Sequence, residues 1–395
     1  MSPSSPQRDT PIRPGLPYRP VRTVGVEEEL LLVDDHTMHP VPVADLILQN
    51  LQSTGGVDRD YGPSLEFEIK QEQIEVVSPP HETLDELLGT IQEGRRRADA
   101  AARGVGARAV ALAMSTLPFD SHVVQAPRYR RMQDHFGITT REQLTCGLHV
   151  HVSVDSDEEG VGVLDRIRPW LPVLLALSTN SPYLRGADTG FASYRYQAWN
   201  RWPSAGAYDV FGSAGVYLAQ VDALLKTGVS LDLGMIYFDA RLSHRAPTVE
   251  TRIADVCLRP EESAAVAVVT RALICTAAAE WAAKVPADPV AASILRLASW
   301  RASKSGLAGT LLDPRTHTPV PAAVAVQALL NHVRTNFVDV AEELFVTDAV
   351  NLILAKGTGA ARQREVLAGG GTCADVVAAA VDETMAGCRK TADVL

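Results

Sequence analysis

Residues 21–33, VRTVGVEEELLLV, carry three consecutive glutamates in the middle of an apolar run. The run predicts a β-strand, even though acidic residues are disfavoured in strands. Because successive side chains of a strand point to opposite faces, Glu27 and Glu29 lie on one face, and Glu28 lies on the other with its apolar neighbours. The strand therefore has one polar side and one side that faces a core.

Two later segments divide in the same way. The segment CGLHVHVSVD places His149 and His151 on one face and apolar residues on the other. The segment TVETRIADV places Glu250 and Arg252 together, opposite valine and isoleucine. Each segment therefore predicts a strand with a chemical side and a core side.

A fourth segment, LEFEIKQEQIEVVSPP, is also strand-like and acidic. If it forms one continuous strand, Glu68 and Glu72 share a face and Glu75 lies on the opposite face unless a bulge intervenes. Only some of these carboxylates can then converge with those of the other strands.

The polar positions of the four segments concentrate glutamate and histidine, and Lys70 is their only lysine. Any one segment alone is explained more simply as the solvated face of an edge strand. Carboxylates gathered on one face repel one another, so the combination favours a bound cation. Several carboxylate oxygens with one or two imidazoles favour Mg²⁺, or Mn²⁺ as an alternative. Zinc held by His149 and His151 is the competing interpretation, but it leaves many glutamates without a role.

The order of the elements predicts an α+β fold. Strand-like runs occur at 23–33, 65–77, 108–115, 146–154, 235–243 and 247–257. Helices are expected from a Thr83–Glu86 capping box to Arg103, with Gly104 as the stop, and at about 160–180, 213–227 and 260–284. From residue 287 the pattern is almost wholly helical, with breaks near Pro314, Pro319 and residues 369–371.

No proline-rich linker or internal repeat divides residues 21–395. We therefore expect one domain, in which helices pack over one face of a largely antiparallel sheet and the C-terminal part is helical. A separate C-terminal helical subdomain is the alternative. Alanine-rich helices also suit packing between subunits, so a homo-oligomer is one expectation for the assembly.

Composition excludes several classes of protein. A net charge of −10 argues against a general binder of nucleic acid or anionic membranes. Residues 1–20 contain six prolines and predict a disordered tail, not a signal peptide. The apolar stretch 264–283 is interrupted by Arg271 and Glu280 and favours a buried helix over a membrane span. Five scattered cysteines indicate reduced thiols, so we expect a cytoplasmic protein.

Motifs of other enzyme classes are missing from the sequence. It has no Gly-x-Ser-x-Gly elbow and no GxxxxGK[ST] loop for phosphates. The segment GVGARA at 104–109 follows a predicted helix and precedes a strand, which is the reverse of a dinucleotide fingerprint, and it indicates a helix stop.

Five ordered motifs resemble the carboxylate–amine ligase family, the type 2 branch of glutamate–cysteine ligases. They are GVEEELLLVD, the acidic strand ending in EVVSPP, CGLHVHVSV, NSPYLRGADTGFASYRYQAWNRWPSAG and TVETRIADVCLRP, and the resemblance covers about residues 20–380. It implies the catalytic fold of glutamine synthetase. In that fold a curved antiparallel sheet holds metal ions and ATP on its concave face and helices on the other.

The resemblance also implies ATP-dependent joining of a carboxylate, such as glutamate, to an amine, such as cysteine, through an acyl phosphate. Arg252 resembles the arginine that contacts the transferring phosphate, beside Glu250. The implied metal ligands are Glu27, Glu29, Glu68, Glu75, His149 and Glu250. The alternatives are a metal-dependent hydrolase and a catalytically weak small-molecule binding protein.

The segment from Gly186 to Gly206 is rich in arginines and aromatic residues. Arginine can contact a substrate carboxylate through two parallel hydrogen bonds, and aromatic rings can wall a pocket. We therefore expect a substrate-binding loop. The candidates, with Arg195 first, are Arg195, Arg201, Arg185 and Tyr194. A packed surface loop with ordinary salt bridges is the alternative.

Overall fold

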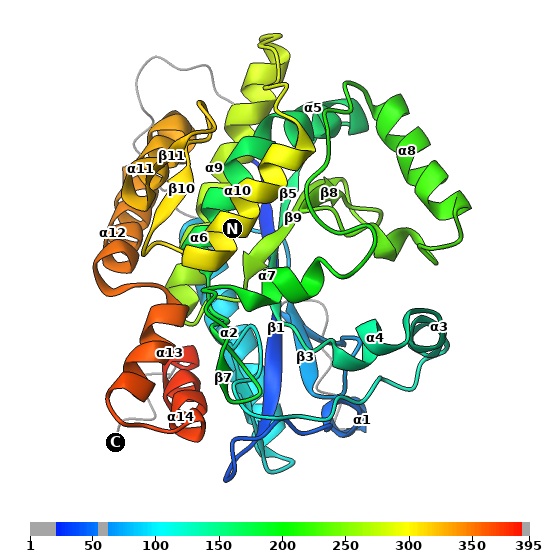
Figure 1. Cartoon of the computed structure of the whole chain (residues 1–395), viewed down its shortest axis with the longest axis vertical. Coiled ribbons are helices and arrows are strands. Elements are labelled where there is room, and N and C mark those ends of the chain that lie inside the picture. The colour runs from blue at the N-terminus through cyan, green and yellow to red at the C-terminus, as the bar shows by residue number, and fades with distance from the viewer. Residues whose placement is uncertain (1–20, 54–61, 389–395) are drawn as a thin grey trace, which may run out of the picture.

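A computed structural model describes residues 21–53 and 62–388 (Figure 1). The predicted tail at 1–20 lies outside these residues. The fold is α+β, as the sequence predicts, and its centre is one seven-stranded sheet in which every pairing is antiparallel. Its strands are β1 (Val24–Asp34), β2 (Ser64–Phe67), β3 (Gln73–Val77), β4 (Ala107–Val110), β5 (Gly147–Ser153), β8 (Ala240–Leu242) and β9 (Thr248–Asp255).

The sheet order is β2-β3-β1-β5-β9-β8, and β4 pairs with the far end of β1. The long strand β1 therefore lies in the middle, between β3 and β5, and runs through the centre of the molecule in Figure 1. The registers bring its first half beside the polar segments of both neighbours, with Glu29 opposite Glu75 and Glu27 opposite His149.

Helices make up most of the remaining chain. They are α1 (Ala44–Ser53), α2 (Leu84–Arg103), α3 (Pro127–Phe136), α4 (Ile138–Glu142), α5 (Asp157–Ile167), α6 (Leu171–Ser178), α7 (Tyr194–Trp199), α8 (Ala214–Lys226), α9 (Pro260–Ala282), α10 (Ala292–Ser305), α11 (Ala322–Val333), α12 (Val340–Lys356), α13 (Gly359–Ala368) and α14 (Cys373–Thr384). The helices predicted to begin at 83, 213 and 260 are confirmed, and the one predicted at 160–180 is two helices joined by a 3-10 turn at 168–170. The helices α1, α3, α4 and α7 were not predicted.

The main core lies between the apolar face of the sheet and the helices α2, α5, α6 and α9. Val26, Val150 and Val152 of the sheet are fully or almost fully buried there, with Ile91 of α2 and Leu273 of α9. In the C-terminal part, α11 and α12 pack against α9 and add their own apolar side chains to the same cluster. The polar face of the sheet is left free for other contacts.

The prediction of one strand over 65–77 is wrong. The chain leaves the sheet at residues 68–72 and returns, so β2 and β3 form an antiparallel hairpin in which Glu66 pairs with Glu75. Glu68 and Glu72 therefore do not share a strand face. The Glu72 side chain is fully buried and accepts hydrogen bonds from the backbone N–H of His122. The turn brings Glu68 to the same side as Glu75, which a continuous strand would not allow.

Two other predicted strands are shorter than expected. The run at 108–115 forms a strand only over β4, and the run at 235–243 forms one only over β8, after a 3-10 turn at 233–235. The helical C-terminal pattern is broken at Pro319, as expected, by a small hairpin of β10 (Thr310–Leu312) and β11 (Pro319–Pro321). A second small hairpin, β6 (Tyr183–Leu184) with β7 (Ala187–Asp188), precedes α7.

Among the described helices, α9 alone is long and apolar enough to cross a membrane by length and composition. Its most apolar window is 89% buried inside the fold, which agrees with the predicted buried helix. All five cysteines are free, also as expected.

Candidate active site

The three glutamates of β1 have two different environments. Glu28 lies on the helix side, where Arg95 of α2 donates to its two oxygens at 2.6 and 2.9 Å and the Ser263 hydroxyl donates at 2.6 Å. Glu27 and Glu29 lie on the polar face, as predicted. There Glu27 lies beside two histidines, and Glu29 lies beside other carboxylates and accepts a hydrogen bond from the backbone N–H of Gly147.

His149 and His151 of β5 face Glu27. His149 Nδ1 lies 3.0 Å from Glu27 Oε2, and His151 Nε2 lies 3.2 Å from Glu27 Oε1. Burial opposes ionisation of Glu27, but its hydrogen bonds with the two histidines outweigh burial and lower the pKa of this carboxyl. Burial, followed by the charge of Arg252, lowers the pKa of His149, which favours its neutral form.

Glu29, Glu68 and Glu75 form an acidic cluster that contains no basic side chain. Ligand oxygens of all three lie within 4.8 Å of one another. Burial, together with the charge of Glu29, raises the pKa of Glu68 to about 8. Burial and the charges of Glu27, Glu68 and Glu29 raise the pKa of Glu75 well above its ordinary value. Glu68 and Glu75 therefore resist ionisation in the absence of a cation.

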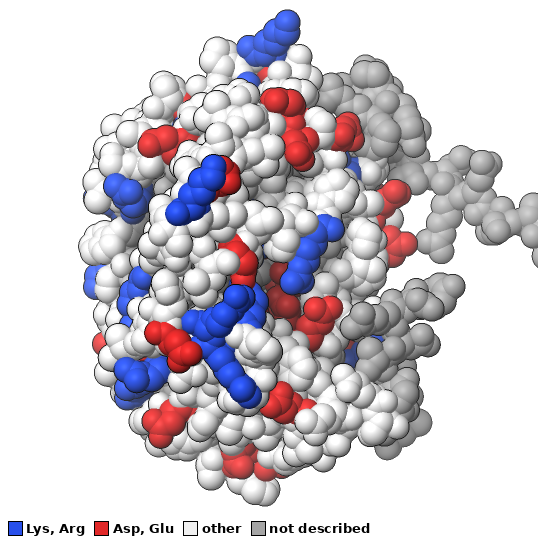
Figure 2. Space-filling model, turned by 90° about the vertical axis from the view of Figure 1, so that its right-hand side faces the viewer, with Lys and Arg blue, Asp and Glu red and all other residues white. Residues whose placement is uncertain are grey.

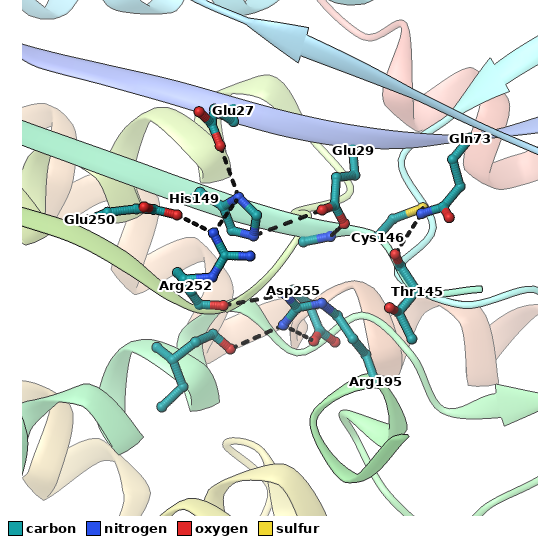
Figure 3. A network of polar contacts seen from close by, with 12 residues as sticks. Glu27, Glu29, Gln73, Thr145, Cys146, His149, Arg195, Glu250, Arg252 and Asp255 are labelled. Atoms are coloured by element: carbon teal, nitrogen blue, oxygen red, sulfur yellow. Dashed lines mark hydrogen bonds and ion pairs between the residues drawn. The ribbon is translucent and has the colours of Figure 1, made fainter. Parts of the chain in front are cut away.

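Glu250 of β9 is held between two arginines. Arg241 donates to its two oxygens at 2.8 and 3.2 Å, and Arg252 donates to Oε1. Burial would raise the pKa of Glu250, but the charges of Arg252 and Arg241 outweigh it and hold this pKa below its ordinary range. Figure 3 shows Glu27, Glu250 and Arg252 meeting around His149, with Glu29 on its other side.

These side chains line one cavity of about 1150 Å³. In the face shown in Figure 2, acidic atoms lie recessed near the centre, with basic side chains beside them. Outside the strands of the sheet, the lining of the cavity includes three aromatic residues and a second bidentate ion pair. The aromatic residues are Tyr129, Trp199 and Tyr237, and in the ion pair Arg128 donates to Asp232 at 2.7 and 3.0 Å.

The donor atoms form three groups that suit divalent cations. In each group the ligand atoms lie within 4.8 Å of one another. The groups are Glu27–Glu75–His149, Glu27–His151–Glu250 and Glu29–Glu68–Glu75. His149 Nε2 is buried, lies 3.8 Å from Glu29 Oε1 and has no hydrogen-bond partner among the described residues. Carboxylate oxygens with few imidazoles are ligands that Mg²⁺ and Mn²⁺ accept.

All six residues predicted as metal ligands line the cavity, and so does Arg252. His151, which the sequence left without a role, joins them through Glu27 and Glu250. Arg241 was missed. Pairing the predicted strand ends, residue 243 with residue 247, places Arg241 opposite Val249, whereas the observed register is shifted by one residue and pairs Arg241 with Glu250. Arg128 and Tyr129 lie on a helix that the sequence pattern did not reveal.

The predicted substrate loop, unlike the predicted metal ligands, lies away from the cavity lining at its four candidate residues. None of its four candidate residues lines the cavity. Arg185 is exposed at a hairpin tip over the ring of Phe119, and Arg201 forms an ion pair with Glu142 at 2.7 Å. Tyr194 is half-buried. Arg195 is buried beneath the cavity wall, so these positions do not support direct contact with a substrate.

Comparison with known proteins gives a consistent result. The sequence profile of the glutamate-cysteine ligase family 2 (GCS2) matches residues 23–383. A Paenarthrobacter aurescens protein with the provisional name glutamate–cysteine ligase 2-1 is 50% identical over 92% of this chain and 95% of its own length. A Streptomyces avermitilis protein with the same provisional name is 45% identical over 92% of this chain and 99% of its own.

Two solved structures have a similar fold at low sequence identity. The bifunctional glutathione synthetase of Pasteurella multocida matches with a TM-score of 0.66 and 14% identity, over 93% of this chain and 52% of that one. The glutamate–cysteine ligase of Francisella tularensis, in complex with AMP, matches with a TM-score of 0.63 and 13% identity, over 92% and 89% of the two chains. The predicted fold, an open antiparallel sheet of the glutamine-synthetase-like ligases, is confirmed.

Proposed function

The chain belongs to the glutamate-cysteine ligase family 2, and from this premise we propose that it is an ATP-dependent carboxylate–amine ligase that forms an amide through an acyl phosphate. Its proposed reaction joins L-glutamate, through the γ-carboxylate, to L-cysteine and releases ADP and phosphate. One observation carries the proposal. Three carboxylate-rich groups converge in one cavity beside Arg252, with ligand atoms close enough to hold divalent cations.

Seven side chains would hold the cations. They are Glu27, Glu29, Glu68, Glu75, His149, His151 and Glu250. Bound Mg²⁺ or Mn²⁺ would neutralise charge on the phosphate groups of ATP. The raised pKa values of Glu68 and Glu75 support this assignment, because burial and neighbouring carboxylates oppose the ionisation of these groups and a bound cation would favour it.

The proposed chemistry has two steps. An oxygen of the substrate carboxylate attacks the γ-phosphorus, and the bond from that phosphorus to the bridging oxygen breaks, which releases ADP. The neutral amine then attacks the acyl carbon, the carbon–oxygen bond to phosphate breaks, and the nitrogen releases its extra proton as the amide forms. Phosphorylation is needed because a free carboxylate would have to expel oxide, which is a very poor leaving group.

Arg252 is proposed to stabilise the charge that builds on the transferring phosphate. Its guanidinium is anchored by Glu250 and lies 5.8 Å from the ring of Trp199 and 5.9 Å from that of Tyr237. Burial disfavours its charge, but Glu250 and Glu27 raise the pKa of Arg252 above its ordinary value, so it stays cationic. A permanent planar cation at this place suits an equatorial phosphate oxygen.

The remaining expectations follow from the same premise. Residues 21–395 are proposed to form a single catalytic domain, which acts in the cytoplasm on small molecules and not on nucleic acid or membranes. The single domain is supported by the core cluster, which includes side chains from β1 and from α12.

A screen of acids and amines for ADP release tests the reaction class. We expect ADP only when ATP, a divalent cation, a carboxylate and an amine are all present, with glutamate and cysteine among the active pairs. A metal-dependent hydrolase would act without ATP, and a binding protein would bind without turnover. Either result would overturn the proposal.

Oxygen labelling tests the acyl phosphate itself. Glutamate labelled with ¹⁸O in its γ-carboxylate should transfer one labelled oxygen to inorganic phosphate as the amide forms. An adenylating enzyme would place the label in AMP. Unlabelled phosphate during amine-dependent turnover would contradict the mechanism.

A further inference from the structure

The pairing of β5 with β9 contains a bulge at the centre of the site. Two residues of β9, Arg252 and Ile253, lie opposite the single residue His149, because the register shifts between Leu148 and Val150. Bulges disrupt the hydrogen-bond ladder locally and change the direction of the side chains that they carry. The direction of Arg252 into the cavity therefore depends on how this bulge is held.

Arg195 of α7 contacts the backbone of the bulge. Its guanidinium donates to the carbonyl oxygens of Arg252 and Ile253, each at 3.3 Å. Nη1 also lies 3.8 Å from Oδ1 of Asp255, and the Arg195 side chain is almost fully buried. Arg195 thus supplies donors to both bulged residues, as Figure 3 shows.

Gly147, the first residue of β5, makes room for this guanidinium. A Cβ atom at this position would lie 2.2 Å from Nη2 and 3.0 Å from Cζ of Arg195. Any side chain larger than hydrogen would therefore displace the guanidinium. The backbone N–H of Gly147 also donates to Glu29 Oε2 at 2.6 Å, so the same residue contacts Arg195 and the acidic cluster.

Trp199 lies near both arginines. Its ring is 5.9 Å from Cζ of Arg195 and 5.8 Å from Cζ of Arg252. Trp199 and Arg252 line the cavity, whereas Arg195 does not. Arg195 is therefore placed to act on the site from behind, through the backbone of β9.

We propose that Arg195 is a positioning residue, which fixes the bulge between β5 and β9 and thereby aims Arg252 and His149 into the cavity. This inference rests on the proposed function, since it assigns Arg195 to the phosphate-transfer step and not to binding of the substrate carboxylate. Displacing a group of this kind by about 1 Å can lower turnover about 10²-fold.

Two variants displace the guanidinium in different ways. Arg195→Lys keeps the charge but loses the planar fork, and Gly147→Ala adds a Cβ where the guanidinium lies. In both we expect kcat for ADP release to fall about 10²-fold. We expect the KM values for ATP and for the carboxylate to change less than about threefold, because neither variant alters a group that contacts them.

The double variant and a control sharpen the test. The methyl group of Gly147→Ala acts by clashing with the Arg195 guanidinium. The Arg195→Lys background lacks this guanidinium, so adding Gly147→Ala there should lower kcat by less than about a further twofold. Arg201→Lys changes an arginine of the same segment that forms an ion pair with Glu142 away from the cavity. Its kcat and KM should stay within about twofold of the unchanged protein.

Three results would overturn the inference. The first is a KM for the carboxylate that rises more than about tenfold while kcat stays almost unchanged. The second is a double variant in which the two losses of kcat multiply. The third is a lower melting temperature with unchanged kcat and KM. The first would make Arg195 a substrate-binding residue. The third would make it a residue of stability alone.

A crystal structure of Gly147→Ala gives a readout that needs no turnover. We expect the guanidinium of Arg252 to move away from Glu250, and an unmoved Arg252 would contradict the inference. If no acid and amine support ADP release in the unchanged protein, the proposed function fails, and this structure still decides whether Arg195 positions Arg252.

Discussion

The two faces of β1 place buried glutamates in different electrostatic environments. On the helix side, Glu28 is buried and meets a bidentate arginine from α2 together with a serine hydroxyl. On the cavity side, Glu29 faces Glu68 and Glu75 without a cation among them. The first carboxylate is neutralised by the protein itself, and the second group is not.

The difference separates a structural charge from a functional one. A buried ion pair with satisfied hydrogen bonds needs nothing further, and breaking it leaves an uncompensated charge. A buried cluster of carboxylates stays partly protonated until a ligand supplies positive charge. Neighbouring glutamates in one strand should therefore respond to the same substitution in opposite ways.

The largest effect is expected for Glu27→Gln on turnover. Removing one negative ligand from the cation groups should lower kcat for ADP release by about 10³-fold or more, or about 4 kcal/mol. The melting temperature should fall only slightly, because the neutral amide loses the charge-assisted contacts of Glu27 with His149 and His151 but also relieves its repulsion of Glu75. Steady-state kinetics and thermal unfolding of the purified variant measure both quantities. Unchanged ADP release would remove Glu27 from the site.

The adjacent substitution Glu28→Gln is the matched control for that result. It should lower the free energy of unfolding by about 3 kcal/mol, because Arg95 loses its buried counter-charge. The kcat of the folded fraction should change less than about threefold. Urea unfolding together with kinetics checks this, and adding Arg95→Met should restore part of the lost stability. A variant that loses turnover and keeps its stability would reverse the comparison.

Arg252→Lys should reduce turnover somewhat less than Glu27→Gln. Loss of the planar fork at the transferring phosphate is expected to lower kcat about 10²-fold, or about 2.7 kcal/mol, with a smaller change in ATP affinity. Kinetics and equilibrium binding of ATP measure the two effects separately. A wild-type kcat would give Arg252 a structural role.

The smallest effect concerns pH and the metal-free protein. The folded-state pKa values of Glu68 and Glu75 are raised, so between about pH 4.5 and 8 the unfolded chain releases protons that the folded protein keeps. Stability should therefore fall as pH rises through this window, by a few degrees in melting temperature. Mg²⁺ should reduce the fall by favouring the ionised carboxylates.

Other buried acids also contribute to this slope, so Glu75→Gln is the necessary control. Without Mg²⁺, its melting temperature should fall less between pH 5 and 8 than that of the unchanged protein. With Mg²⁺, the advantage of the variant should disappear. Equal slopes for both proteins without Mg²⁺ would contradict the raised pKa of Glu75.

Much of the fold and of the site could be predicted from strand periodicity. The alternation in three segments correctly assigned Glu27, Glu29, His149, Glu250 and Arg252 to one face. It failed for residues 65–77, because periodicity carries no information about where a strand stops and turns back. Glu68 therefore lies beside Glu75 for a reason that the pattern did not contain.

The substrate-loop prediction shows a different limit. A segment rich in arginine and aromatic residues predicts a binding surface by composition alone, and composition does not distinguish the two faces of a short helix. In α7, Trp199 lines the cavity and Arg195 lies behind the wall. Only the packing of α7 on the sheet separates a lining residue from a supporting one.

The sequence by itself determined that this protein has two-faced antiparallel strands with an acidic face, because side-chain direction in a strand depends on local backbone geometry with a period of two. The tertiary structure decided which acids receive a counter-charge from the protein. Glu28 meets Arg95, 67 positions away in the chain, whereas Glu29, Glu68 and Glu75 are gathered against one another. Such pairing depends on distances between elements that are remote in sequence, and those distances exist only once the sheet and its helices have packed.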